Sequence, residues 1–267
     1  MGLLVTDKVR EGAAQRRAPV RKRAASRVKP VALQRPLLEI AEVRKVFGKR
    51  VVLDQLTFSA SLGELVAVTG DSGAGKSTLL RLIHGQLRPD RGRLWVDGHP
   101  LHRRFLRGVE RLRRDSGFIF QDHRLLARLN ALENVIVALQ MARPDVPYGV
   151  IRRAAHEALE AVGLAEDKRK FPVELSLGER QRVAVARTLA LRPRLVLADE
   201  PTASLDERNA SVVMELLSHA ACEGALVVVA THHLDFRAAQ VVSLPRIPIT
   251  PKKPRRALPL RPRRKSK

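Results

Sequence analysis

The feature that most constrains the fold of this chain is a glycine-rich loop between an apolar strand and an amphipathic helix. A strand is predicted over residues 64–69, and the helix predicted over residues 76–86 carries leucine and isoleucine at helical spacing. The loop between them is Gly70-Asp71-Ser72-Gly73-Ala74-Gly75-Lys76-Ser77, which fits G-x-x-x-x-G-K-[ST]. Its glycines let successive backbone N–H groups turn towards phosphates, and the helix N-terminus adds a favourable partial charge. The loop therefore predicts a nucleotide phosphate site in an α/β fold.

The side chains at the end of the loop have expected roles at that site. Lys76 would pair with the β- and γ-phosphates of ATP, and Ser77 would place its hydroxyl on Mg²⁺. Thr78 follows directly and belongs to the same binding set. ATP and Mg²⁺ are therefore the expected ligands.

An acidic element later in the chain supports the same chemistry. The segment Leu195-Val196-Leu197-Ala198-Asp199-Glu200 is an apolar strand that ends in two acids, where a parallel sheet presents its ligand crevice. We expect Asp199 to hold Mg²⁺, through water, and Glu200 to polarise the attacking water. The alternative is a strand that ends in a solvated acidic pair. The phosphate loop favours the catalytic interpretation, because it independently requires a magnesium-binding acid.

The remaining pattern predicts a mainly parallel sheet with helices on both faces, since apolar strands alternate with amphipathic helices. Residues 122–180 are expected to form an inserted helical subdomain. Further strands are expected at residues 37–46, 51–58, 94–96, 117–120, 225–231 and 241–244, and helices at 151–162, 179–191 and 207–222.

The net charge of +23 is concentrated at the two ends of the chain. Residues 1–36 hold ten Lys/Arg and two acids, and residues 245–267 hold ten Lys/Arg and no acid, which leaves +5 for residues 37–244. Both ends are rich in Pro, Ala and Arg and lack apolar periodicity, so we expect disordered extensions around a nucleotide-binding domain at 37–244. Their charge suits an anionic membrane surface or nucleic acid, or serves solubility alone.

Cysteine content and hydropathy favour a cytoplasmic protein. Cys222 is the only cysteine, which excludes a disulfide framework and a four-cysteine zinc site. No apolar run approaches the roughly 20 residues that cross a bilayer, so any membrane contact is expected to be peripheral. His99 and His102 are expected to be solvated loop histidines, because no further histidine or cysteine is placed to complete a metal site with them.

Over residues 37–244 the chain resembles the ATP-binding cassette (ABC) ATPases. Beyond the loop and the acidic strand, the resemblance rests on motifs in the family's order: Phe120-Gln121-Asp122, Ser204-Leu205-Asp206 and Ala230-Thr231-His232. It implies that Gln121 touches Mg²⁺ and the lytic water, that Asp206 belongs to the nucleotide site, and that His232 binds the γ-phosphate. It further implies that Phe47 stacks on adenine. The implied fold is a P-loop NTPase of the ABC type with an N-terminal antiparallel β subdomain and an inserted helical subdomain.

The family's signature, Leu-Ser-Gly-Gly-Gln, is matched by the segment Leu175-Ser176-Leu177-Gly178-Glu179. The resemblance implies that Ser176 and Gly178 open a helix that caps the γ-phosphate bound by a second subunit. Leu177 stands where the family has glycine. We expect a branched side chain there to resist positive φ and to crowd the phosphate, which would weaken hydrolysis.

Within the family, residues 69–80 and especially 120–126 resemble the cell-division ATPases of the FtsE type and their lipoprotein-release relatives. The resemblance implies a homodimer at the cytoplasmic face of the inner membrane, bound to an integral membrane subunit that is FtsX-like or a permease. The segment after Gln121 would be the docking surface for that subunit. Alternatives are the ATPase of a lipoprotein-release system or of another ABC exporter or importer. A different class is a weakly hydrolysing scaffold or an RNA- or ribosome-associated ABC protein.

Overall fold

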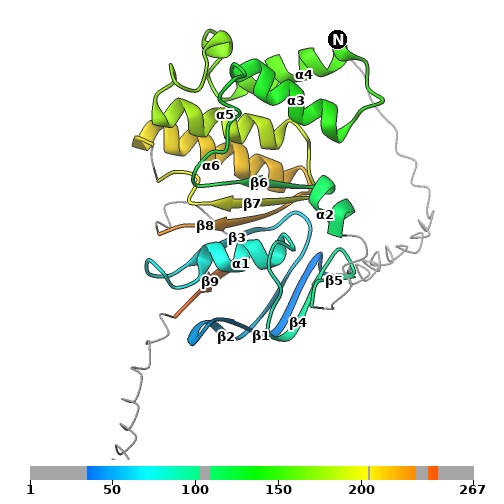
Figure 1. Cartoon of the computed structure of the whole chain (residues 1–267), viewed down its shortest axis with the longest axis vertical. Helices are drawn as coiled ribbons and strands as arrows, with labels where there is room; N and C mark the ends of the chain where they lie inside the picture. The colour runs from blue at the N-terminus through cyan, green and yellow to red at the C-terminus, as the bar shows by residue number, and fades with distance from the viewer. Residues whose placement is uncertain (1–34, 103–108, 204, 233–239, 246–267) are drawn as a thin grey trace, which may run out of the picture. The chain divides into compact units, whose positions relative to one another are not determined.

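The computed structural model describes residues 35–102, 109–203, 205–232 and 240–245, which form two sheets and the helices around them (Figure 1). Ser204, which belongs to the motif Ser204-Leu205-Asp206, lies outside these residues.

A parallel sheet of five strands, in the order β6-β7-β8-β3-β9, forms the centre of the described domain. Its strands are β3 (Leu65–Thr69), β6 (Ser116–Ile119), β7 (Leu195–Asp199), β8 (Leu226–Ala230) and β9 (Gln240–Ser243). Alternate side chains enter two different cores: Val228 packs on the side of α1, whereas Val227 and Val229 pack on the side of α3 to α6. Both faces are therefore covered, as the continuous apolar strands predict, and Figure 1 shows α1 on one side and α5 and α6 on the other.

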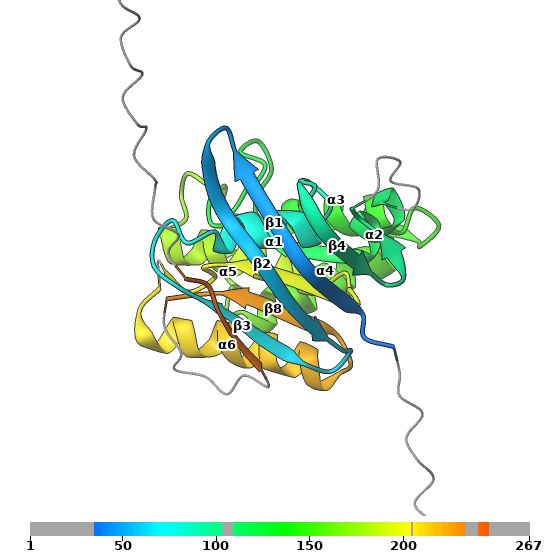
Figure 2. The same ribbon diagram turned by 90° about the horizontal axis from the view of Figure 1, so that it is seen from below.

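The N-terminal strands form a separate antiparallel sheet in the order β2-β1-β4-β5, which confirms the antiparallel β subdomain (Figure 2). The strands are β1 (Leu38–Phe47), β2 (Arg50–Ala60), β4 (Arg91–Val96) and β5 (His99–Pro100). The β1–β2 register runs from Leu38 opposite Ala60 to Phe47 opposite Arg50, with irregularities in between. The hairpin therefore ends with Phe47 and Arg50 facing each other beside the phosphate loop.

Most predicted helices are present, with shifted ends. The helices are α1 (Lys76–Ile83), α2 (Val109–Asp115), α3 (Ala131–Ala142), α4 (Tyr148–Ala161), the short η1 (Asp167–Arg169), α5 (Leu177–Leu189) and α6 (Glu207–Cys222). Helix α1 ends three residues earlier than predicted, because Gly85 adopts φ 73° and leaves the helical conformation. Helix α5 begins two residues earlier, because Ser176 forms a capping box with Glu179. The short elements β5 and α2 were not predicted, and the limits 122–180 of the helical subdomain stay a prediction.

His102 corrects the expectation of solvated loop histidines. In the β4–β5 hairpin the imidazole of His102 folds back onto β4, so that its Nδ1 lies 3.2 Å from the backbone nitrogen and 3.0 Å from the backbone oxygen of Leu94. The ring also meets Trp95 edge-on, with the ring centroids 4.8 Å apart. His99 lies in β5 and is half-buried. Both side chains therefore belong to the packing of the hairpin.

His84, at the end of α1, is half-buried, in surroundings that disfavour its charged form. Its ring meets Phe118 edge-on at 5.2 Å, and its buried Nδ1 has no hydrogen-bond partner among the described residues. Burial, followed by the nearby Arg113 guanidinium, lowers the pKa of His84 from 6.5 to about 4. The helix that starts at the phosphate loop thus ends on a neutral imidazole at physiological pH.

We predict that His84 makes folding stability sensitive to mild acid. Its pKa is lower in the folded than in the unfolded chain, so the folded state binds fewer protons and loses stability as the pH falls from 6.5 towards 4. The expected contribution between pH 7 and pH 4.5 is about 2 kcal/mol. Urea unfolding at both pH values should show that His84→Gln removes this part of the difference. His219→Gln, an exposed change on α6, is the control, and an undiminished difference in His84→Gln would contradict the prediction.

Candidate functional site

The glycine-rich loop has no room for side chains at its key positions. Gly70, Gly73 and Gly75 adopt φ of 143°, 80° and 103°. A Cβ on Gly70 would lie 2.6 Å from the carbonyl oxygen of Leu244, and one on Gly75 would lie 2.8 Å from Cγ1 of Val52. Only glycine fits there, and Gly75 is also the N-cap of α1. The loop thus ends at a helix N-terminus, the arrangement that binds phosphate.

Lys76 lies at the centre of a charged cluster. Its side chain is only 5% exposed, and its Nζ donates to the carbonyl of Gly70 at 2.8 Å. Nζ also lies 2.9 Å from His232 Nε2 and 3.7 Å from Glu200 Oε1, and these two atoms are 2.7 Å apart. The three side chains come from α1 and from the carboxyl ends of β8 and β7. The structure thus brings together the predicted phosphate ligand, water-polarising acid and γ-phosphate histidine.

Glu200 adopts a strained backbone conformation at this cluster. Its φ is 49°, in the left-handed region that a glutamate rarely adopts, and its N–H donates to the carbonyl of Ala230 at 2.9 Å. Strain of this kind persists only where the surroundings hold it, and it is frequent at active sites. The bond to β8 holds Glu200 beside His232.

Ser77 and Asp199 form the oxygen-rich side of the site. The Ser77 hydroxyl donates to Asp199 Oδ1 at 2.9 Å, and Asp199 is 5% exposed. Burial raises the pKa of Asp199, and the Ser77 hydrogen bond opposes this. Hydroxyl and carboxylate oxygens are the ligands that Mg²⁺ prefers, and a divalent cation would offset the burial of the carboxylate. The residues therefore fit a magnesium ion.

A single cleft of about 530 Å³ contains most of the predicted residues. Its lining residues are Phe47, Arg50, Val52, Ser72, Gly73, Gly75, Lys76, Ser77, Thr78, Gln121, Glu200 and His232. Arg50 and Val52 were not predicted. Arg50 donates through Nη2 to the carbonyl of Gly73 at 3.0 Å, so it joins the β1–β2 hairpin to the phosphate loop. The only sequence signal for it was a cation three residues after Phe47.

Seven predicted residues do not line this cleft: Gly70, Asp71 and Ala74 belong to the phosphate loop and Asp199 is bonded to Ser77, whereas the other three lie at the starts of α5 and α6. Ser176 caps α5 and accepts from the Glu179 N–H at 3.2 Å, and Gly178 is the second residue of that helix. Asp206 caps α6 and accepts from the Asn209 N–H at 2.8 Å. All three lie at helix N-termini, and their roles towards a nucleotide stay predictions.

The backbone argument about Leu177 is wrong. Leu177 is the first residue of α5 and is not among the residues with positive φ, so this position demands no left-handed conformation. Ser176 already makes the turn into the helix, and leucine is a good helix former. The side chain is 49% exposed, so only the crowding argument remains.

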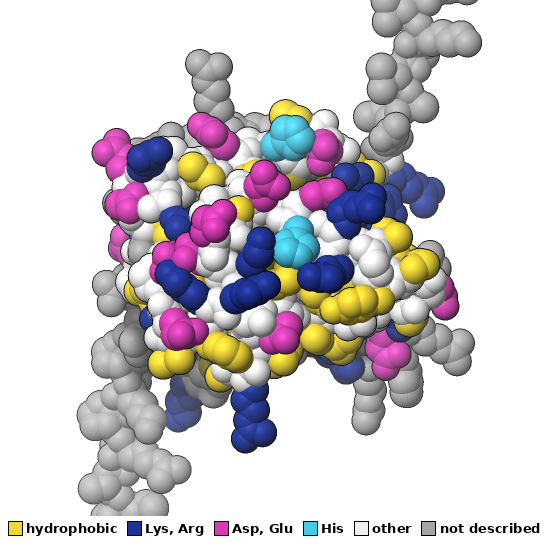
Figure 3. All heavy atoms as spheres, turned by 90° about the horizontal axis from the view of Figure 1, so that it is seen from above, with side chains coloured by type: hydrophobic (Ala, Val, Ile, Leu, Met, Phe, Trp, Pro, Cys, Tyr) yellow, Lys and Arg dark blue, Asp and Glu magenta, His cyan; other side chains and the backbone are white. Residues whose placement is uncertain are grey.

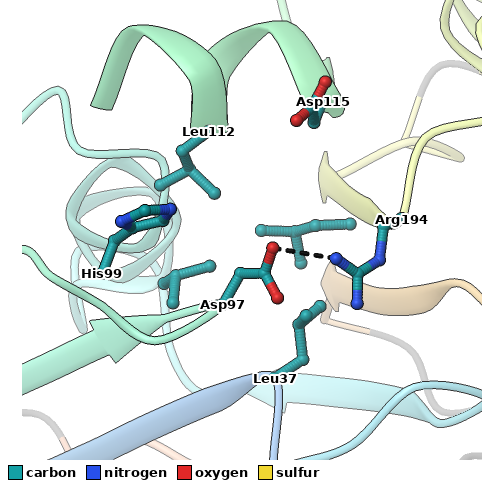
Figure 4. A pocket seen from close by; sticks show the side chains of 8 residues that line it. Leu37, Asp97, His99, Leu112, Asp115 and Arg194 are labelled. Atoms are coloured by element: carbon teal, nitrogen blue, oxygen red, sulfur yellow. Dashed lines mark hydrogen bonds and ion pairs between the residues drawn. The ribbon is translucent and has the colours of Figure 1, made fainter. Parts of the chain in front are cut away.

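A second cavity, of about 190 Å³, lies between the two sheets and contains none of the predicted residues (Figure 4). Its apolar walls include Leu37 and Leu112, and Asp97 and Arg194 form an ion pair of 2.8 Å at its edge. Half of its lining residues are apolar and the guanidinium of Arg194 is already paired with Asp97, so this cavity is not a candidate phosphate site.

Comparisons with known proteins agree with the geometry. Residues 53–203 match the family model of the ABC transporter. The cell division ATP-binding protein FtsE of Escherichia coli K12 is 40% identical over 201 residues, which are 75% of this chain and 90% of that protein. The octopine permease ATP-binding protein P of Rhizobium meliloti is 36% identical, over 76% of this chain and 80% of that protein.

Solved structures of similar fold are ATP-binding cassettes. One is a dimeric cassette in a post-hydrolysis state, bound to ADP and Pi, with a TM-score of 0.72 and 32% identity. The match covers 78% of this chain and 94% of that one. Another is cbiO1 of Clostridium perfringens, part of the ABC transporter complex cbiONQ, with a TM-score of 0.67, 30% identity, and coverage of 78% and 84%.

We predict that Arg50 contributes to nucleotide binding although it lies outside the sequence motifs. Arg50→Ala removes the hydrogen bond to the Gly73 carbonyl and loosens the loop, which should weaken binding of a fluorescent ATP analogue about three- to tenfold. Lys49→Ala, the exposed neighbour in the hairpin, is the matched control and should bind like the wild type. Equal affinities for the two variants would show that Arg50 has no such role.

Proposed function

This chain belongs to the ABC transporter family of ATP-binding proteins, and on that premise we propose that it hydrolyses ATP as a homodimer and thereby drives or regulates an integral membrane partner. The family is one of ATPases, and this chain is an ABC ATP-binding subunit. The observation that carries the proposal is the meeting of Lys76, Glu200 and His232 in one cleft with the Ser77–Asp199 pair beside them.

Each side chain of the cleft has a task in the proposed reaction. Lys76 neutralises the β- and γ-phosphates, while Phe47, 47% exposed at the hairpin end, offers its ring to adenine. Glu200 accepts a proton from the attacking water, and His232, whose Nε2 lies 2.7 Å from Glu200 Oε1, binds the γ-phosphate. Ser77, Asp199 and Gln121 hold Mg²⁺, which when bound draws charge away from the phosphates. The cluster therefore suits hydrolysis of a terminal phosphate.

The second half of the proposed site comes from another copy of the chain. Ser176 and Gly178 sit at the N-terminus of α5, where unpaired N–H groups favour an anion, and they lie outside the chain's own cleft. In a symmetric dimer, the α5 N-terminus of each copy would face the cleft of the other copy, so that both contacts are made within the pair. The similar cassette solved as a dimer supports this arrangement.

For the partner, we propose an FtsX-like membrane subunit and a role in cell division. The support is 40% identity to FtsE over 90% of its length. The matches to an octopine permease subunit and to a methionine import subunit keep a permease as the alternative partner. A lipoprotein-release role is a further alternative from the same resemblance. The segment after Gln121 is the proposed docking surface.

We place the protein at the cytoplasmic face of the membrane, as a peripheral subunit. Among the described residues no helix has both the length and the apolar character of a membrane span. Figure 3 shows the face over α3 and α4, where cationic and anionic side chains are interspersed, which does not favour RNA binding by that face. The basic ends remain the proposed contact with anionic lipid, and RNA that survives moderate salt in the purified protein would instead support the RNA-associated class.

Hydrolysis should depend on the carboxylate of Glu200. Glu200→Gln keeps the shape of the side chain but cannot accept a proton, so phosphate release should fall at least about a hundredfold. Glu160→Gln, an exposed change on α4, should release phosphate at the wild-type rate. Equal, background-level rates in the wild type and in Glu200→Gln would overturn the enzyme assignment and leave a nucleotide-binding scaffold.

The side chain of Leu177, and not its backbone, should limit hydrolysis. Because Leu177 has a helical backbone, Leu177→Ala should raise kcat as much as Leu177→Gly, about threefold or more if the exposed side chain crowds the phosphate. Initial rates of phosphate release at saturating ATP measure this. A gain in Leu177→Gly alone would restore the backbone argument, and no gain in either variant would end the idea that Leu177 weakens activity.

A further inference from the structure

Two consecutive residues that follow β6 have a backbone conformation that is rare for residues other than glycine. His123 and Arg124 follow each other with φ of 57° and 49°, both in the left-handed region. For residues that carry a Cβ this conformation is unfavourable, and two in succession need external support. The turn lies only two residues beyond Gln121, which lines the nucleotide cleft.

Arg187 of α5 supplies that support. Its Nη2 donates to the carbonyl of His123 at 2.8 Å, and its Nη1 donates to the carbonyl of Arg124 at 2.7 Å. The rigid, planar fork of a guanidinium suits two adjacent acceptors, which a lysine cannot reproduce. Arg187 makes these bonds from a partly buried position, and this burial lowers the pKa of its guanidinium.

Other contacts fix the two ends of the turn. The imidazole of His123 is buried, only 7% exposed, so packing also holds the turn. On the outer side, the guanidinium of Arg124 lies 3.7 Å from the centre of the Phe120 ring. Farther along the chain, Asn134 binds Leu126 through both its amide oxygen and its amide nitrogen. The segment from Phe120 to Leu126 is therefore held as one piece, by Arg187 of α5 and Asn134 of α3.

The same helix begins at the residues proposed to reach a second subunit. Ser176 is the N-cap of α5, and Arg187 lies about three turns further along the helix. Because an α-helix of this length moves as a rigid body, a shift at Ser176 is passed to the carbonyls that Arg187 holds. Gln121 would then move with them.

We infer that Arg187 is a positioning residue that holds the His123–Arg124 turn in its left-handed form, keeps Gln121 at the cleft, and ties its place to the N-terminus of α5. This inference rests on the proposed roles of Gln121 and Ser176. Arg187 does not line the cleft and acts through Gln121 alone.

The first test separates positioning from nucleotide binding. Arg187→Ala should lower kcat for ATP about tenfold and change KM less than about twofold, because Lys76 and Phe47 keep their places. Arg143→Ala is the matched control, since Arg143 also donates to a backbone carbonyl, that of Leu191 two residues beyond α5, and should keep the wild-type kcat. An unchanged kcat in Arg187→Ala would overturn the inference.

The second test relieves the strain directly. Glycine adopts positive φ without cost, so Arg124→Gly added to Arg187→Ala should restore kcat to within about threefold of Arg124→Gly alone. A double variant as slow as Arg187→Ala would show that the loss does not pass through the turn. Thermal unfolding checks that each variant is folded. If Arg187→Ala does not fold, Arg187→Lys replaces it, with a fall in kcat in the same direction.

A third measurement is independent of hydrolysis. Amide hydrogen exchange of residues 121–126 in the full-length chain, without nucleotide, should be about tenfold faster in Arg187→Ala and unchanged in Arg143→Ala. If the wild type shows no Glu200-dependent hydrolysis, the proposed function fails while exchange still decides on Arg187. Unchanged exchange overturns the inference, and so does faster exchange with unchanged kcat, which would reduce Arg187 to a structural role.

Discussion

The nucleotide cleft depends on the close approach of β2 to the phosphate loop at Gly75, which has no Cβ atom. A side chain on Gly75 would come within 2.8 Å of Val52 Cγ1 and 3.1 Å of the Val52 carbonyl oxygen. This contact seats the antiparallel sheet on the phosphate loop, and the β1–β2 hairpin then delivers Phe47 and Arg50 to the place where Lys76 lies. The close fit of backbone on backbone therefore makes one site out of two sheets.

The structure divides the proposed site into an inner and an outer part. Lys76, Glu200 and His232 meet within the chain, at the carboxyl ends of neighbouring parallel strands. Ser176 and Asp206 instead cap α5 and α6, and neither lines the cleft. At α5 the capping box satisfies the N–H groups of Ser176 and Glu179, which leaves those of Leu177 and Gly178 for an anion held by another molecule. A nucleotide site shared by two chains requires both parts: a cleft that one chain leaves incomplete, and binding groups outside that cleft which can reach the cleft of the other chain.

The parts of the fold that the sequence predicted are those determined locally. The phosphate loop, β7 with its two acids, and α6 follow from apolar runs, glycines and caps that lie next to each other in the chain. Arg50 could not be found this way, because only the register of the β1–β2 hairpin brings it to Gly73. The start of α5 was misjudged although Ser176 and Glu179 carry the capping-box spacing, because the apolar pattern begins later. The same capping box decides the backbone of Leu177, against the expectation from the glycine it replaces.

The left-handed backbone of Glu200 and the burial of Asp199 both cost stability in the free protein. A cation at Asp199 offsets one of these costs, so ligand binding and folding are linked. Any ligand that binds only the folded form adds stability by mass action, about 2.7 kcal/mol at a hundred times its Kd. Nucleotide and magnesium, bound as proposed, would therefore raise the free energy of unfolding, and the folded fraction of the chain would fall when both are withdrawn.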